Sequence, residues 1–339
     1  MKKNNAVYYW LIFGCVLIAL MVVIGGITRL TQSGLSMVEW KPIVGAIPPL
    51  NEQEWNHEFE LYKSSPEYKH YNSHFSLSDF KSIFFWEYLH RLIGRIIGLV
   101  FLIPCVVFWL KGKFSKELKN RVIIIFIGGL CQGIIGWLMV KSGLVKNPHV
   151  SHYRLALHLA TALALIVYIY WTAMYVKHGN SRLKTVLFPV KYINGIAILI
   201  SLQIVYGAFV AGLKAGKMYT TFPKMGDVWF PVELGTSFKD SGFLALTEAH
   251  SVVQLIHRLF GVSLFLIACY LLLILKKQHV AIVGPIRFLS LLIILQVVLG
   301  IFTLVLAVPV NLGVLHQSVA IIILLTIFQL KFRSKYNWN

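Results

Sequence analysis

Eight apolar runs of about 20 residues each constrain the fold of this chain more than any other feature. They cover residues 7–28, 83–110, 121–141, 152–176, 190–212, 248–275, 286–308 and 313–332, approximately. A run of this length crosses a bilayer as a helix, whereas a membrane β-barrel would show alternating segments of about ten residues. The sequence therefore predicts an all-α polytopic membrane protein with eight transmembrane helices.

Basic residues are unevenly distributed between two sets of loops. The N-terminus, the second, fourth and sixth loops and the C-terminal tail carry 17 Lys and Arg with one acid, Glu117. The remaining loops carry 12 Lys and Arg with 11 acids. By the positive-inside rule, both termini are expected in the cytoplasm. The net charge of +19 is thus a topology signal, and nucleic-acid binding is not expected.

The first apolar run is expected to be retained as a helix. It follows only Lys2 and Lys3, is too long for a signal-peptide core, and ends without a small-residue cleavage site. No arginine- and serine-rich transit segment precedes it, which favours a bacterial plasma (inner) membrane. Cysteines occur only in predicted helices, so no disulfide framework is expected. Gly25-Gly26 is interpreted as a site of close helix packing.

The two halves of the chain repeat one pattern. Residues 90–94 read His-Arg-Leu-Ile-Gly and residues 257–261 read His-Arg-Leu-Phe-Gly. In the same order, Gln132, Gly136 and His158 correspond to Gln296, Gly300 and His316. Membrane proteins are often built from such repeats. The repeat predicts two pseudo-symmetric four-helix bundles, residues 1–180 and 181–339, related by a two-fold axis along the membrane normal.

Four histidines lie inside predicted helices, a short distance below the outer membrane face: His90, His158, His257 and His316. An ionisable residue in a bilayer is a functional-site candidate, although any one of them could instead be a hydrogen-bonding packing residue. Their positions predict two bis-histidine metal sites, one per bundle. Histidine is a common axial ligand of haem iron, and a helical bundle can hold a macrocycle between facing helices. Zinc is less consistent, because a structural zinc site needs four close ligands.

Residues beside the histidines differ between the halves. Arg91 and Arg258 are each expected to pair with a haem propionate. Three residues before His90 is Glu87, whereas Gln254 holds the matching place before His257. Only the carboxyl group can take or give a proton, so the N-terminal half is predicted to be catalytic and the C-terminal half to hold a redox cofactor. The alternative is that Glu87 forms a buried ion pair with Arg91.

Two outer loops are long, residues 29–82 and 213–247, and the first contains a predicted amphipathic helix at 51–63. Long ordered loops are usually lids or binding elements. A surface linker is the alternative for each loop.

The residues described above resemble the haem A synthase family, in its proteobacterial and mitochondrial branch. The resemblance rests on Glu87-x-x-His90-Arg91, the second His-Arg pair, His158, His316 and the string Gly-Gly-x-Thr-Arg-Leu-Thr-x-Ser-Gly-Leu-Ser-Met-Val-Glu-Trp-Lys-Pro at 25–42, and it covers nearly the whole chain. It implies an enzyme that oxidises the C8 methyl group of haem O to a formyl group, giving haem A for terminal oxidases.

The resemblance also implies roles for individual residues. His90 and His158 would bind the substrate haem O, His257 and His316 would ligate a haem b cofactor, and Glu87 would be the essential carboxylate. Membrane lipid, an unidentified electron donor, a haem O synthase and cytochrome oxidase assembly factors would be its partners. Some members carry paired loop cysteines that this chain lacks. Whether oxygen comes from O₂ or from water stays open.

Two other functions are compatible with paired histidines. A di-haem b-type electron-transfer cytochrome explains the four histidines and the repeat, but it does not explain the difference between Glu87 and Gln254. A haem transporter would need a relay to the cytoplasmic side, whereas all four histidines are predicted near one face.

Overall fold

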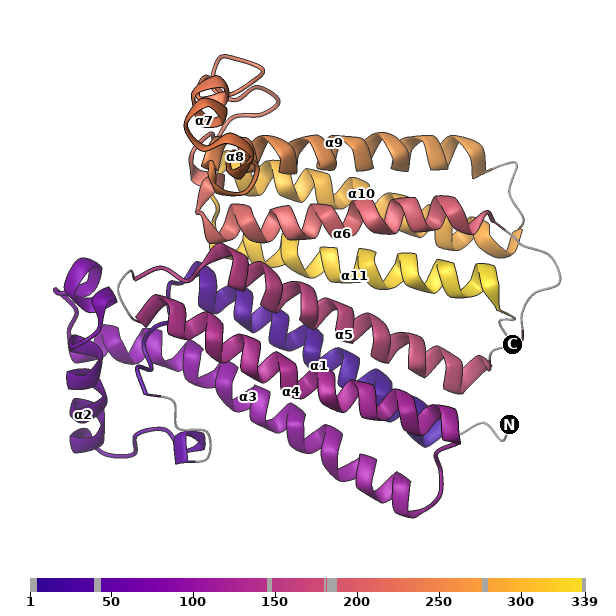
Figure 1. The fold of residues 1–339 in the computed structure, drawn as a ribbon, viewed down its shortest axis with the longest axis horizontal. Helices are drawn as coiled ribbons and strands as arrows, with labels where there is room; N and C mark the ends of the chain where they lie inside the picture. Colours follow the sequence, from indigo (N-terminus) through magenta and orange to yellow (C-terminus); the bar gives the residue numbers. More distant parts are fainter. Residues whose placement is uncertain are drawn as a thin grey trace. The chain divides into compact units, whose positions relative to one another are not determined.

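The computed structural model describes residues 5–39, 44–144, 148–179, 181, 188–275 and 280–336. In this part of the chain every regular secondary-structure element is a helix (Figure 1). The long helices are α1 Asn5–Leu30, α3 Leu77–Leu110, α4 Lys116–Leu144, α5 His152–His178, α6 Val190–Gly212, α9 His250–Ile274, α10 Val280–Val305 and α11 Val310–Lys335. The short ones are η1 Val44–Ala46, α2 Glu52–Lys63, η2 Tyr68–Asn72, η3 Ala215–Lys217, α7 Leu234–Ser241, η4 Gly242–Leu244 and α8 Ala245–Glu248.

All eight long helices are long and apolar enough to cross a membrane, which confirms the eight predicted spans. The largest differences are at α10, which begins at Val280 rather than near residue 286, and at α3, which begins at Leu77 rather than near residue 83. Its start is a capping box, in which Ser76 accepts from the Asp79 amide and the Asp79 carboxylate accepts from the Ser76 amide. With 34 residues, α3 is about 51 Å long at 1.5 Å per residue. It therefore exceeds the ~30 Å hydrocarbon core of a bilayer.

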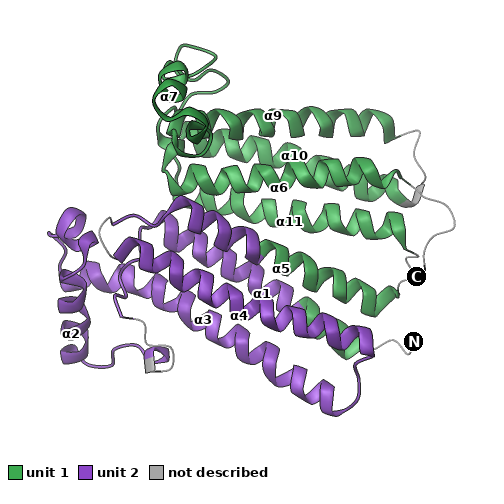
Figure 2. Cartoon of the chain, viewed as in Figure 1, with its two compact units in different colours: residues 1–12, 163–339 green, residues 13–162 purple. Residues whose placement is uncertain are grey.

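The chain divides into two compact units, shown in Figure 2. Unit 1 comprises residues 1–12 and 163–339, and unit 2 comprises residues 13–162. His90 and His158 both lie in unit 2, and His257 and His316 both lie in unit 1, so each site can be described by itself.

In unit 1, α6, α9, α10 and α11 form a four-helix bundle, in which each helix packs against the next and α11 closes on α6. The last turns of α5 also belong to this unit, and Trp171 packs edge-on against Phe332 of α11 with ring centroids 5.2 Å apart. These contacts explain why the unit takes in part of α5.

Unit 2 contains most of α1, all of α3 and α4, and the first turns of α5. The segment between α1 and α3 is ordered where it is described, and α2 confirms the helix predicted at 51–63. Asn51 caps α2 by accepting from the Glu54 amide. Of residues 25–42, the string on which part of the family resemblance rests, Trp40, Lys41 and Pro42 lie outside the described residues.

An aromatic cluster holds α2 against the start of α3. Its buried members are Met37, Phe59, Tyr62, Phe80 and Phe84. The Phe80 ring stacks on Phe59 and on Tyr62, with centroids 5.2 Å apart in both cases. Such packing fits an ordered loop better than a loose surface linker.

Candidate functional site

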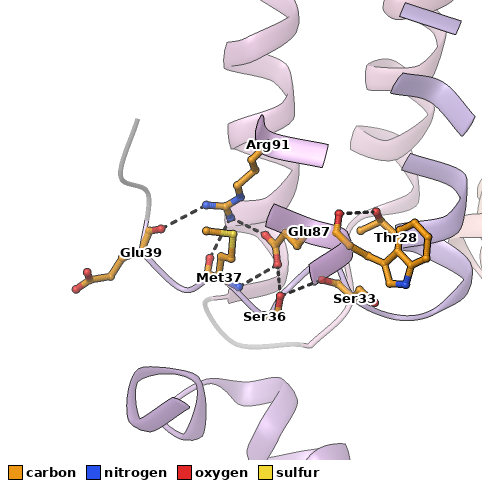
Figure 3. Close-up of polar contacts among 8 residues, drawn as sticks. Thr28, Ser33, Ser36, Met37, Glu39, Glu87 and Arg91 are labelled. Atoms are coloured by element: carbon orange, nitrogen blue, oxygen red, sulfur yellow. Dashed lines mark hydrogen bonds and ion pairs between the residues drawn. The ribbon is translucent and has the colours of Figure 1, made fainter. Parts of the chain in front are cut away.

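Glu87 is buried at the point where α3 meets the segment that follows α1 (Figure 3). Its Oε2 accepts hydrogen bonds from the Ser36 hydroxyl at 2.7 Å and from the Met37 amide at 2.9 Å. Its Oε1 lies 2.6 Å from a guanidinium nitrogen of Arg91, one turn later on α3. Both carboxylate oxygens are therefore held by the protein itself.

Arg91 extends the same network. Besides the ion pair, it donates to the backbone carbonyls of Met37 at 3.0 Å and Glu39 at 3.3 Å. The ion pair between Glu87 and Arg91, which the sequence left as an alternative, is present. Its presence does not test a catalytic role, because a carboxylate in an ion pair can still exchange a proton.

A related arrangement occurs in unit 1. Gln254 donates to the Tyr219 carbonyl at 2.9 Å, and Arg258 donates to the same carbonyl at 2.9 Å and to that of Lys224 at 3.1 Å. The Tyr219 hydroxyl donates to the Glu233 carboxylate at 2.6 Å, a bond that raises the pKa of Tyr219. In each unit, the residues three before and one after a histidine thus hold a loop against their helix.

His257 of α9 and His316 of α11 face each other in unit 1. Their ring centroids are 6.5 Å apart, and the Nδ1 atom of each ring is buried and has no hydrogen-bond partner among the described residues. A metal between two imidazoles, with metal–nitrogen bonds of about 2.0–2.1 Å, would put the centroids roughly 6–6.5 Å apart. The pair fits the two axial ligands of one iron.

His90 of α3 and His158 of α5 both lie in unit 2, where each ring contacts a glycine of a neighbouring helix. The structure thus brings His257 and His316 face to face and places His90 and His158 in the same unit. Across the described residues, no group of three or more His, Cys, Asp and Glu side chains is arranged to hold a metal ion. A macrocycle needs only two axial ligands from the protein, so the donor set fits haem.

Each of the four rings lies against a glycine on a neighbouring helix. A Cβ atom built on Gly136 would lie 2.9 Å from the His158 ring, and one on Gly300 would lie 2.9 Å from the His316 ring. The corresponding distances are 3.2 Å from Gly25 to His90 and 3.2 Å from Gly207 to His257. No larger residue fits these places without displacing the ring or its helix.

Glutamine amides lie beside three of the rings. Gln132 is 3.1 Å from His158 Nδ1, Gln203 is 3.3 Å from His257 Nε2, and Gln296 is 3.3 Å from His316 Nε2. Gln203 and Gly207 were missed by the sequence reasoning, although they repeat the Gln-x-x-x-Gly spacing of Gln132–Gly136 and Gln296–Gly300. That third occurrence was the signal that could have identified them.

Eight helices long and apolar enough to cross a membrane define a polytopic membrane protein, and its histidines between helices form a candidate haem site. Comparison with known proteins narrows this class. Residues 8–328 match the COX15-CtaA family, described as cytochrome oxidase assembly protein.

Individual relatives cover almost the whole chain. The haem A synthase of Flavobacterium psychrophilum is 43% identical over 331 residues, which are 96% of this chain and 97% of the relative. The haem A synthase of Wolbachia sp. subsp. Brugia malayi is 41% identical over 95% of both chains, and that of Maricaulis maris is 41% identical over 95% of this chain and 94% of its own. The chain belongs to the haem A synthase family.

Proposed function

We propose that this protein oxidises the C8 methyl group of haem O to a formyl group and so supplies haem A to terminal oxidases. The relatives named haem A synthase, similar over nearly the full length, support this activity. The observation that carries it is the pairing of histidines, with the buried carboxylate Glu87 on the helix that carries His90.

In this proposal the two histidine pairs have different roles, one in binding the substrate and the other in binding a cofactor. His90 and His158 bind substrate haem O in a catalytic N-terminal domain, residues 1–180. His257 and His316 ligate a haem b cofactor in a C-terminal domain, residues 181–339. Haem b, when bound, supplies a redox centre. The support for this assignment is that the buried Glu87 comes three residues before His90, whereas the uncharged Gln254 comes three residues before His257.

The histidine pairs also suggest how the protein is organised. The Gln-x-x-x-Gly spacing, the glycine contacts and the loop-holding Glu87–Arg91 and Gln254–Arg258 pairs recur in both units. They support a pseudo-two-fold relation along the membrane normal. The distribution of basic residues supports cytoplasmic termini, and the bacterial relatives support a bacterial plasma membrane.

Protein side chains bind and orient the substrate and move protons. One ring nitrogen of His90 and one of His158 fix the orientation of the substrate macrocycle, so that one methyl group faces the reacting side. Glu87 takes or gives a proton there, as a carboxyl group can and an amide cannot. The farnesyl tail of haem O lies against apolar helix surface or lipid.

Arg91 and Arg258 pair with haem propionates in this proposal. The Nε atom of Arg258 is buried and has no hydrogen-bond partner among the described residues, so it has a donor to spare. Contacts with a haem O synthase, oxidase assembly factors and an unidentified electron donor belong to the same proposal.

Haem extraction and chromatography of the purified protein, wild type beside Glu87→Ala, test this function. Wild type is expected to carry haem b with haem O or haem A, and the variant to accumulate haem O or a partly oxidised form. If both carry only haem b in equal amount, the protein is instead a di-haem electron carrier and Glu87 has no role in the chemistry.

A further inference from the structure

The neighbours of the four histidine rings differ at one place. In α4, α6 and α10 the residue four positions before the contacting glycine is a glutamine: Gln132, Gln203 or Gln296. In α1, four positions before Gly25, it is Met21. One histidine of the four, His90, therefore lies beside a helix with a thioether where the others have an amide.

Met21 and Gln203 occupy matching positions by an independent criterion. A Cβ atom on Gly94, four residues after His90, would lie 3.3 Å from Met21 Cε. A Cβ atom on Gly261, four residues after His257, would lie 3.4 Å from Gln203 Nε2. Met21 and Gln203 therefore occupy equivalent positions. Each precedes the glycine that contacts a histidine ring by four residues, and each lies near the glycine that follows that histidine by four residues.

The amides suit rings that act as metal ligands. A ligand imidazole carries a proton on the nitrogen that does not bind the metal, and it usually donates that proton to a fixed oxygen. Gln203 Oε1 and His257 Nδ1 are both buried without a hydrogen-bond partner in the described part of the chain, and so are Gln296 Oε1 and His316 Nδ1. Reorienting the ring and the amide would satisfy both atoms and free Nε2 for a metal.

Two of the glutamines are themselves held in place. Gln132 donates to the His158 carbonyl at 2.8 Å, and Gln296 donates to the His316 carbonyl at 2.9 Å. The Thr161 hydroxyl also donates to Gln132 Oε1 at 2.7 Å. Met21 offers no N–H donor, and its sulfur is only a weak acceptor.

We propose that Gln132, Gln203 and Gln296 are positioning residues that lock His158, His257 and His316 onto iron, and that His90, beside Met21, is the exchangeable ligand. This rests on the proposed function, in which both histidine pairs bind haem. It leaves the haem at His257 and His316 closed on both faces. In the substrate site His90 can leave the iron, which would free a coordination position on the side of α3, the helix that also carries Glu87.

Carbon monoxide binding to the reduced, haem-loaded, full-length protein tests the proposal, because CO binds iron only where a ligand leaves. Haem content is measured by extraction and CO stoichiometry by optical difference spectra. Wild type is expected to bind one CO for two haems. Gln203→Met should raise this to two, and Met21→Gln should slow CO binding about fivefold or more, as expected for one added hydrogen bond.

Matched variants separate locking from simple disruption. Met21→Leu lacks an amide and should keep wild-type CO binding, and Gln203→Glu keeps an acceptor oxygen and should keep the second haem closed. If Gln203→Met does not accumulate, Gln296→Met tests the same lock from α10. Unchanged CO stoichiometry and rate in both swaps, with two haems present, overturn the proposal. A wild-type protein without two six-coordinate haems would instead overturn the proposed function.

Discussion

Glu87 and Arg91 form an ion pair of 2.6 Å on successive turns of α3, and both bind the backbone around Met37. The side chain of Glu87 is 4% exposed and that of Arg91 16%, so the pair is largely shielded from water. Breaking a buried pair by removing one partner usually costs several kcal/mol. Any substitution of Glu87 therefore changes both a proton-transfer group and the anchor of a loop.

Glu87→Gln is expected to lower turnover of haem O by about 10²-fold or more, the usual contribution of a general acid or base. An amide of the same shape can still bond to Ser36 or Met37, but it cannot exchange a proton. Haem extraction after growth would show haem O or a half-oxidised haem in place of haem A. Turnover equal to wild type would exclude a catalytic role.

The matched change Arg91→Lys separates the two roles of Glu87. Lysine keeps the positive charge but cannot reach Glu87 and two carbonyls together, because it lacks the planar guanidinium fork. If Glu87 acts mainly as a loop anchor, Arg91→Lys and Glu87→Gln should reduce the amount of bound haem O alike. If Glu87 transfers protons, Arg91→Lys should retain much more turnover than Glu87→Gln at equal haem content.

The sequence identified the helices and the histidine pairs because both depend on local patterns. Apolar length alone marks a membrane helix, and an ionisable residue within one is conspicuous. The loop contacts of Glu87 could not be predicted in this way. They depend on how residues 33–39 fold back onto α3, and Ser36 and Met37 carry no signal that would mark them as its partners.

Gly25 shows a second limit of the sequence. Its pairing with Gly26 suggested close helix packing, and the structure shows the specific object that needs the space, the His90 ring. Likewise, α3 begins at Leu77 because Ser76 and Asp79 cap it. The hydrophobic run alone placed the start later, since the first turns of α3 pack against α2 rather than lie in the apolar layer.

Gly136→Ala and Gly300→Ala should each impair haem binding in one unit only. In both cases the added Cβ atom would lie 2.9 Å from an imidazole carbon, so the ring must move. Overpacking of this kind typically costs 1–3 kcal/mol. The expected result is loss of substrate haem from the Gly136 variant and of haem b from the Gly300 variant, measured by haem extraction and optical spectra.

Gly133→Ala on α4 and Gly284→Ala on α10 are the controls, because an added Cβ atom meets nothing within 4 Å at either place. They should keep full haem content and gain some helix stability, since Ala is favoured over Gly in a helix interior. Equal haem loss in all four variants would show that contact between the added Cβ atom and the imidazole ring is not the cause of the haem loss.

Phe80→Ala should destabilise the packing of α2 on α3 by about 3–5 kcal/mol, the usual cost of truncating a buried phenylalanine. The Phe80 side chain is fully buried and stacks on Phe59 and Tyr62. Since Met37 belongs to the same cluster and its amide binds Glu87, loosening the cluster should also loosen the network around Glu87.

Hydrogen exchange should show reduced protection of the α2 amides in the Phe80→Ala variant. Phe85→Ala, at a position 53% exposed on the same helix, should leave that protection unchanged. Equal protection in the Phe80 variant and wild type would mean that α2 is held by contacts other than this cluster.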